Sequence, residues 1–188
     1  MDLLLSPLAW LAAAGLLAGV AGWLPYPGVL RVIALLVGLG SLAAMTPWVA
    51  NRLLGQLERD APRAACASAP EVLVVLAGGV DLRPRDAADF GALNGASRRR
   101  MDAAITAWRA APGTRLGRVT SASHWPRARL AFDASGLRPC AVVADVRRLP
   151  AGLPWALIPR LGALEKTEDA LHEIVGLAWY RWRARDDA

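Results

Sequence analysis

Lysine is nearly absent from this chain of 188 residues, and cysteine occurs only twice. Lys166 is the only lysine, so the formal net charge of +6 comes almost wholly from arginine. A basic chain of this kind can meet nucleic acid, anionic lipid or phosphorylated substrates, although an arginine-rich composition also follows from genomic base composition alone. Cys66 and Cys140 either pair in an oxidising compartment or stay reduced in the cytosol, so they do not decide the compartment.

Charge is absent from two long stretches near the N-terminus, residues 3–24 and 32–50. Each stretch has roughly the 20 apolar residues that cross a bilayer core of about 30 Å. A cleaved signal peptide is disfavoured because no basic region precedes the first stretch and a second one follows closely. The sequence therefore predicts a permanent transmembrane hairpin over residues 1–52, turned at the PYPG segment, residues 25–28.

The orientation of this hairpin rests on a small difference in arginine content. Arg31 lies between the two spans, whereas Arg52, Arg59 and Arg63 follow the second one. The positive-inside bias favours a cytoplasmic soluble part in a bacterial inner membrane, with the periplasmic side as the alternative. Beside such a hairpin, membrane lipid and lipid-linked phosphates are better candidate partners than nucleic acid.

The soluble part, residues 71–188, follows a polar connector over residues 53–70 and contains no repeat. EVLVVL, residues 71–76, is a continuous β-branched and leucine run, which is typical of a strand buried on both faces of a parallel sheet. Further strands are predicted over 116–121 and 140–146, and helices over 97–111, 124–135 and 161–183. Strands that alternate with helices predict an α/β domain with a mostly parallel sheet.

Two turns at strand ends are candidate binding elements. Gly78 and Gly79 follow the first strand, where glycine lets backbone amides approach a ligand closely. The second strand runs through Ser121 to His124 and Arg127 at a helix N-terminus, which is a place where anions bind. An anion site and a capped helix with a solvent-facing histidine both remain open on these residues alone.

VTSASHWPRARLAFDASGLRP, residues 119–139, closely resembles the signature of the ElyC/SanA/YdcF family, envelope-associated proteins catalogued as a domain of unknown function. The two N-terminal spans and further segments look like the ElyC-type branch in the right order. These segments are VVLAGG (74–79), RMDAAITAWRAAPGTRL (100–116), PWALIP (154–159) and LHEIVGLAWYRWR (171–183).

The resemblance implies a Rossmann-like three-layer α/β/α domain and a role in peptidoglycan or lipid-carrier-linked polysaccharide biogenesis. A nucleotide-like ligand such as S-adenosylmethionine has been suggested for a soluble relative. The histidine turn itself favours an anionic, phosphorylated ligand, and we expect no metal. Another envelope protein is a further candidate partner. Matching positions give the predicted pocket: Gly78, Gly79, Arg100, Ser121, His124 and Arg127.

The chain departs from the family pattern between residues 112 and 119, where a block of about one third of the domain is missing. One parallel strand with its crossover needs about 30 residues, so we expect a sheet smaller by one or two strands. The acidic side of the family pocket is lost with this block. Asp81, Asp86 and Asp89 lie on a loop that the sequence does not place, and we expect Glu173, on the last helix, to be structural.

Three hypotheses follow for the function. The first is a membrane-anchored envelope factor that binds the anionic ligand, and it is favoured because the acidic residues are lost. The second is a hydrolase or transferase with His124 as the acid/base, which needs a carboxylate beside the ring. The third is a degenerate member whose aromatic and basic tail, residues 179–183, contacts a partner protein or lipid headgroups.

Overall fold

The computed structural model shows two compact units. One unit contains residues up to 56 together with 148–175, and the other contains residues 57–147 together with the C-terminal residues from 176. The structure describes residues 2–24, 28–62, 70–76, 79–83, 85, 89–110, 115–134, 136–137 and 139–186. These ranges do not include Gly78, Cys66, Asp86 or residues 25–27 of the PYPG segment.

The first unit is helical. Its elements are α1 (Asp2–Leu5), α2 (Pro7–Trp23), α3 (Gly28–Ala44), α4 (Pro47–Leu57), the 3-10 turn η2 (Trp155–Leu157) and α7 (Leu161–Asp186) as far as residue 175. Residues 148–175 are thus grouped with the N-terminal helices.

Helices α2 and α3 pack against each other through small residues. Ala14, Ala21, Ala34 and Ser41 are buried, and a Cβ built on Gly38 would lie 3.8 Å from the Cβ of Ala14. Large apolar side chains point outward instead, as in Leu16, Leu35, Leu36 and Leu39. Small residues between helices and large apolar residues outside are typical of helices that pack in lipid.

The expected single helix over residues 32–50 is wrong. Helix α3 ends at Ala44, and α4 starts at Pro47 after a bend of 67°. Proline removes a backbone donor and disfavours helical backbone in the residue before it, Thr46. Among the described residues no single helix is long and apolar enough to cross a membrane, and only the bent pair α3 and α4 passes that test, by length and composition.

The second unit is an α/β unit, as the sequence predicted. It contains β1 (Pro70–Val75), η1 (Phe90–Ala92), α5 (Gly95–Ala110), β2 (Arg115–Ser121), α6 (Trp125–Ala134), β3 (Cys140–Asp145) and α7 from residue 176. The described strands form one sheet of order β1-β2-β3 in which both pairs are parallel. The three predicted strands are confirmed to within one residue at each end, because their β-branched runs are local signals.

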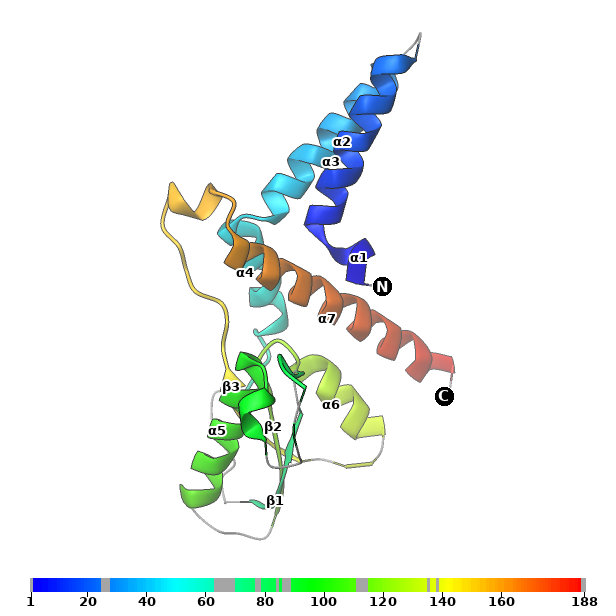
Figure 1. The fold of residues 1–188 in the computed structure, drawn as a ribbon. Helices are drawn as coiled ribbons and strands as arrows, with labels where there is room; N and C mark the ends of the chain where they lie inside the picture. The colour runs from blue at the N-terminus through cyan, green and yellow to red at the C-terminus, as the bar shows by residue number, and fades with distance from the viewer. Residues whose placement is uncertain are drawn as a thin grey trace. The chain divides into compact units, whose positions relative to one another are not determined.

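Helices α5 and α6 cover opposite faces of this sheet (Figure 1). Val119 of β2 packs in a core with Ala104 of α5 and Val142 of β3. Thr120, the next residue of β2, faces the other way and lies with Ala128 of α6. The unit is therefore a small three-layer α/β/α arrangement.

The two crossover connections must have opposite hands. The chain steps from β1 to β2 and from β2 to β3 in the same direction, with all strands parallel. Because α5 and α6 lie on opposite faces, one crossover is right-handed and the other is left-handed. Roughly 98% of such connections are right-handed, so this small sheet carries an exceptional connection.

Cys140 opens β3 and is disulfide-bonded. The sequence has one other cysteine, Cys66, which lies outside the described residues. At the other end of β3 the backbone N–H of Arg147 donates to Glu58 Oε1 at 2.8 Å. The start of β3 is therefore held by a disulfide, and the residues just after its end are held by a hydrogen bond to the Glu58 side chain.

Candidate anion-binding site

The glycine turn after β1 holds the start of helix α5. Gly79 has a φ of +119°, which favours glycine, and its carbonyl accepts from Asn94 N at 3.2 Å and from Ser97 Oγ at 2.8 Å. The N-cap of α5 is Asn94, whose Oδ1 accepts from Ser97 N at 2.8 Å. The helix therefore begins two residues before the predicted start at Ser97, whose hydroxyl donates to the glycine turn instead.

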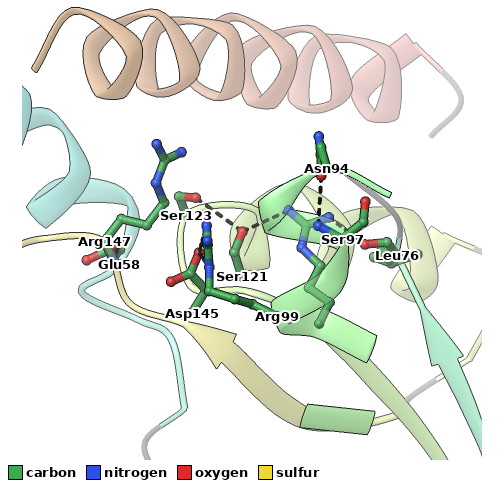
Figure 2. Close-up of polar contacts among 10 residues, drawn as sticks. Glu58, Leu76, Asn94, Ser97, Arg99, Ser121, Ser123, Asp145 and Arg147 are labelled. Atoms are coloured by element: carbon green, nitrogen blue, oxygen red, sulfur yellow. Dashed lines mark hydrogen bonds and ion pairs between the residues drawn. The ribbon is translucent and has the colours of Figure 1, made fainter. Parts of the chain in front are cut away.

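Arg100 connects α5 to the ends of two strands. It is 2% exposed and donates one hydrogen bond through Nη1 to the carbonyl of Leu76, directly after β1. Its Nη2 donates to Ser121 Oγ at the end of β2 at 3.2 Å. Ser121 Oγ is in turn 3.3 Å from Ser123 Oγ, and Figure 2 shows the two hydroxyls facing each other. A buried guanidinium is thus positioned at the carboxyl edge of the sheet.

A cavity of about 250 Å³ opens at this edge on the α6 side of the sheet. Three of the predicted site residues line it, namely Arg100, His124 and Arg127. Ser121 is not a lining residue but accepts a hydrogen bond from Arg100. The remaining described lining residues are Leu76, Thr120, Ala128, Ala131, Phe132 and Tyr180. Gly79 is not among them, and Gly78 lies outside the described residues.

The structure adds a residue that the sequence reasoning missed. Thr120 is 0% exposed and lines the cavity, and its Oγ1 has no hydrogen-bond partner among the described residues. A buried hydroxyl without a partner costs about 1–3 kcal/mol. The alternation along β2 could have identified it, since Ser121 and Val119 share the α5 face and leave Thr120 on the other.

Arg127 extends from the first turn of α6 toward α7. A Cβ built on Gly176 would lie 3.0 Å from Arg127 Cδ and 3.4 Å from its Nε. That distance is tighter than side chains normally tolerate, so the missing side chain at Gly176 makes room for Arg127. The sequence reasoning treated this part of α7 only as a contact surface, and Tyr180 of the same segment lines the cavity.

The charge of the cavity is one-sided among the residues that the structure describes there. Two arginines and a histidine line it, and the described lining residues include no carboxylate. Asp145 pairs instead with Arg99 at 3.0 Å, Asp81 is exposed, and Asp89 Oδ2 accepts from a loop N–H at 3.1 Å.

Glu173 is 1% exposed on α7. Within the described part of the chain no group of three or more His, Cys, Asp or Glu side chains could hold a metal ion. The arrangement offers hydrogen-bond donors and positive charge, which suit an anion.

Comparison with known proteins does not add a family. No family model, no curated protein and no solved structure matches this chain. The resemblance to the ElyC/SanA/YdcF family therefore remains a prediction from the motifs. Support for the candidate site comes from the geometry of the cavity alone.

Proposed function

We propose that this protein is a membrane-anchored cell-envelope factor that binds the phosphoryl group of an anionic ligand in the cavity beside α6. The observation that carries the proposal is the cavity itself. Arg100, Thr120, His124 and Arg127 line it together at the carboxyl edge of a parallel sheet. Open α/β sheets bind ligands at this edge.

Phosphate recognition follows from the donors in the cavity. A guanidinium forms paired, charge-assisted hydrogen bonds with phosphate oxygens, and imidazole and hydroxyl groups donate to the remaining ones. The N-terminal turn of α6 adds the positive end of the helix dipole.

The size of the cavity limits the ligand. The cavity has a volume of about 250 Å³. Pockets for whole small molecules are usually about 300–1,000 Å³. The cavity therefore suits a phosphoryl head and its first few atoms, with Phe132, Ala131 and Tyr180 against the apolar part.

Membrane anchorage is supported by the distribution of side chains on α2 and α3. Their contact surface consists of small residues, whereas Leu16, Val32, Leu35 and Leu39 are 55–72% exposed. A continuous exposed apolar surface of this kind marks a membrane or protein contact. The anchor would keep the cavity beside a membrane-linked ligand such as a lipid carrier phosphate.

The envelope role is proposed from the motif resemblance to an ElyC-like protein with a Rossmann-like domain and an internal deletion. The opposite hands of the two crossovers support the deletion. If a block of one strand and one helix were removed after α5, this helix would connect β1 to a strand on the other side of β1 in the sheet from the strand that was lost. The short sheet and the exceptional connection then have one cause.

The compartment is proposed from the disulfide at Cys140. Structural disulfides are rare in the bacterial cytosol and common in the periplasm. The positive-inside difference rested on three arginines against one, which is a weaker physical argument than a covalent bond. We therefore propose that the soluble part lies on the periplasmic side of the inner membrane.

Binding is favoured over catalysis. A hydrolase or transferase that uses His124 as acid/base needs a carboxylate beside the ring. The described residues that line the cavity carry cationic and hydroxyl groups, and none of them carries a carboxylate. The geometry therefore supports recognition of an anion.

The test is isothermal titration calorimetry, in which the full-length protein is titrated with inorganic phosphate and, separately, with a short alkyl phosphomonoester. Arg127→Gln should weaken binding roughly tenfold to a hundredfold, because a hydrogen bond to a charged group contributes about 1.5–3 kcal/mol. The matched control is Arg129→Gln, since Arg129 lies on the same helix, is 64% exposed and pairs with Asp133. Equal affinity in the two variants would refute the site.

A further inference from the structure

A loop in the helical unit exposes an unusual amount of apolar surface. We define residues 149–161 as the apolar loop. Its large apolar side chains are exposed by 43–74%, and they are Leu149, Leu153, Trp155, Leu157, Ile158 and Leu161. Exposed apolar clusters of this density mark a contact with a membrane or another protein.

The apolar loop is fixed to the end of α3 and to α4. The backbone N–H of Arg160 donates to the carbonyl of Met45, in the bend after α3, at 3.0 Å. The side-chain amide of Asn51 on α4 bonds both backbone groups of Leu149, donating at 2.6 Å and accepting at 3.1 Å. The loop is therefore held at one end of the α2/α3 hairpin within the same unit.

The hairpin on its own is short for a bilayer. Helices α2 and α3 have 17 residues each. At about 1.5 Å per residue each is about 26 Å long, against a hydrocarbon core of about 30 Å. An apolar surface at one end of the hairpin would extend its apolar length toward the thickness of the hydrocarbon core.

Composition and direction also favour lipid over a protein partner. If α3 stands along the membrane normal, the 67° bend turns α4 close to the membrane plane, with Trp48 55% exposed in its first turn. In the apolar loop the Arg160 guanidinium lies 5.9 Å from the centre of the Trp155 ring. Tryptophan with neighbouring arginine is the side-chain combination of the headgroup region.

We propose that the apolar loop and Trp48 together form an interfacial collar, which lies in the headgroup and upper acyl region of the leaflet where α3 ends. This inference rests on the membrane anchorage in the proposed function. The collar's apolar side chains continue the outward surface of α3 through Leu39 and Leu42, which are 55% and 41% exposed. The collar fixes the depth at which the hairpin enters the bilayer.

The experiment uses the full-length protein in nanodiscs made with brominated or ordinary phosphatidylcholine. Tryptophan emission is compared between the wild type and Trp155→Phe, so that the difference isolates Trp155 among eight tryptophans. Brominated acyl chains should remove most of this difference signal, and aqueous iodide should leave it nearly unchanged. Trp125→Phe serves as the control, because Trp125 is 8% exposed in the other unit and should respond to neither quencher.

The same measurement on Trp23→Phe separates the two proposals. Trp23 ends α2 and is 92% exposed, so an inserted hairpin places it against lipid. Quenching of Trp23 by brominated lipid, with Trp155 quenched only by iodide, would overturn the collar and leave the anchor intact. If lipid quenches neither tryptophan, the membrane anchor and the collar both fail.

Discussion

The Thr120 hydroxyl makes the sharpest prediction about the cavity. Replacing Thr120 by valine keeps the volume of the side chain nearly unchanged and removes only the hydroxyl. That hydroxyl is fully buried and has no hydrogen-bond partner among the described residues. Thr120→Val should therefore stabilise the ligand-free protein by about 1–2 kcal/mol, because the desolvation cost of an unpaired hydroxyl disappears.

The same substitution should weaken phosphate binding if the ligand displaces the side chains that cover the hydroxyl, which has no accessible surface in the ligand-free protein. For a protein of this size about 1 kcal/mol shifts the melting temperature by roughly 2–4 °C, so the stabilisation is measurable by thermal denaturation in detergent. Calorimetric titration with inorganic phosphate measures the loss of affinity. A stabilising change that lowers binding is the pattern expected at a functional site.

The matched control is Thr167→Val in the helical unit. Thr167 is 1% exposed, and its hydroxyl donates to the carbonyl of Ala44 at 2.7 Å. Removing this satisfied hydroxyl should destabilise the protein by about 1 kcal/mol or more. If Thr120→Val lowers the melting temperature as much as Thr167→Val does, the Thr120 hydroxyl is paired and our account of the cavity is incorrect.

Two further predictions concern Arg127 and the disulfide. Gly176→Ala should displace the Arg127 side chain and reduce phosphate affinity on the order of tenfold, about 1.4 kcal/mol, whereas Gly162→Ala, with open space at its Cβ, should have no effect in the same titration. Cys140→Ser should lower stability by about 2–4 kcal/mol in thermal denaturation. Maleimide should label the wild type from cells only after reduction, and labelling without reduction would rule out the periplasmic placement.

The sequence was a good guide wherever the signal is local. The β-branched runs located all three strands, and the capping, glycine and proline signals located α5 and α6 to within about two residues. It was a poor guide at Pro47, where the structure has a bend between two helices. An apolar run has the same composition whether the helix that it forms is straight or bent. The sequence also started α5 at Ser97, whereas the helix begins at Gly95 with Asn94 as its N-cap, because Ser and Asn are both good caps and only the fold shows which one faces the helix end.

The candidate site was predicted in part. Arg100, His124 and Arg127 gather in one cavity as the motifs suggested, although their role in binding a ligand stays a prediction. Thr120 and Tyr180 were missed because their place in the cavity depends on which face of the sheet α6 covers and on where α7 passes. Neither of these follows from spacing along the chain.

The sequence by itself determined the local elements of this protein, because helix and strand formation depends on the periodicity and turn chemistry of neighbouring residues. It also determined the excess of arginine that makes an anionic ligand the natural choice. Only the tertiary structure decided that α5 and α6 lie on opposite faces, that residues 148–175 join the N-terminal helices, and that Thr120 is buried beside two arginines. These features depend on contacts between residues that are distant in the chain, which no local pattern specifies.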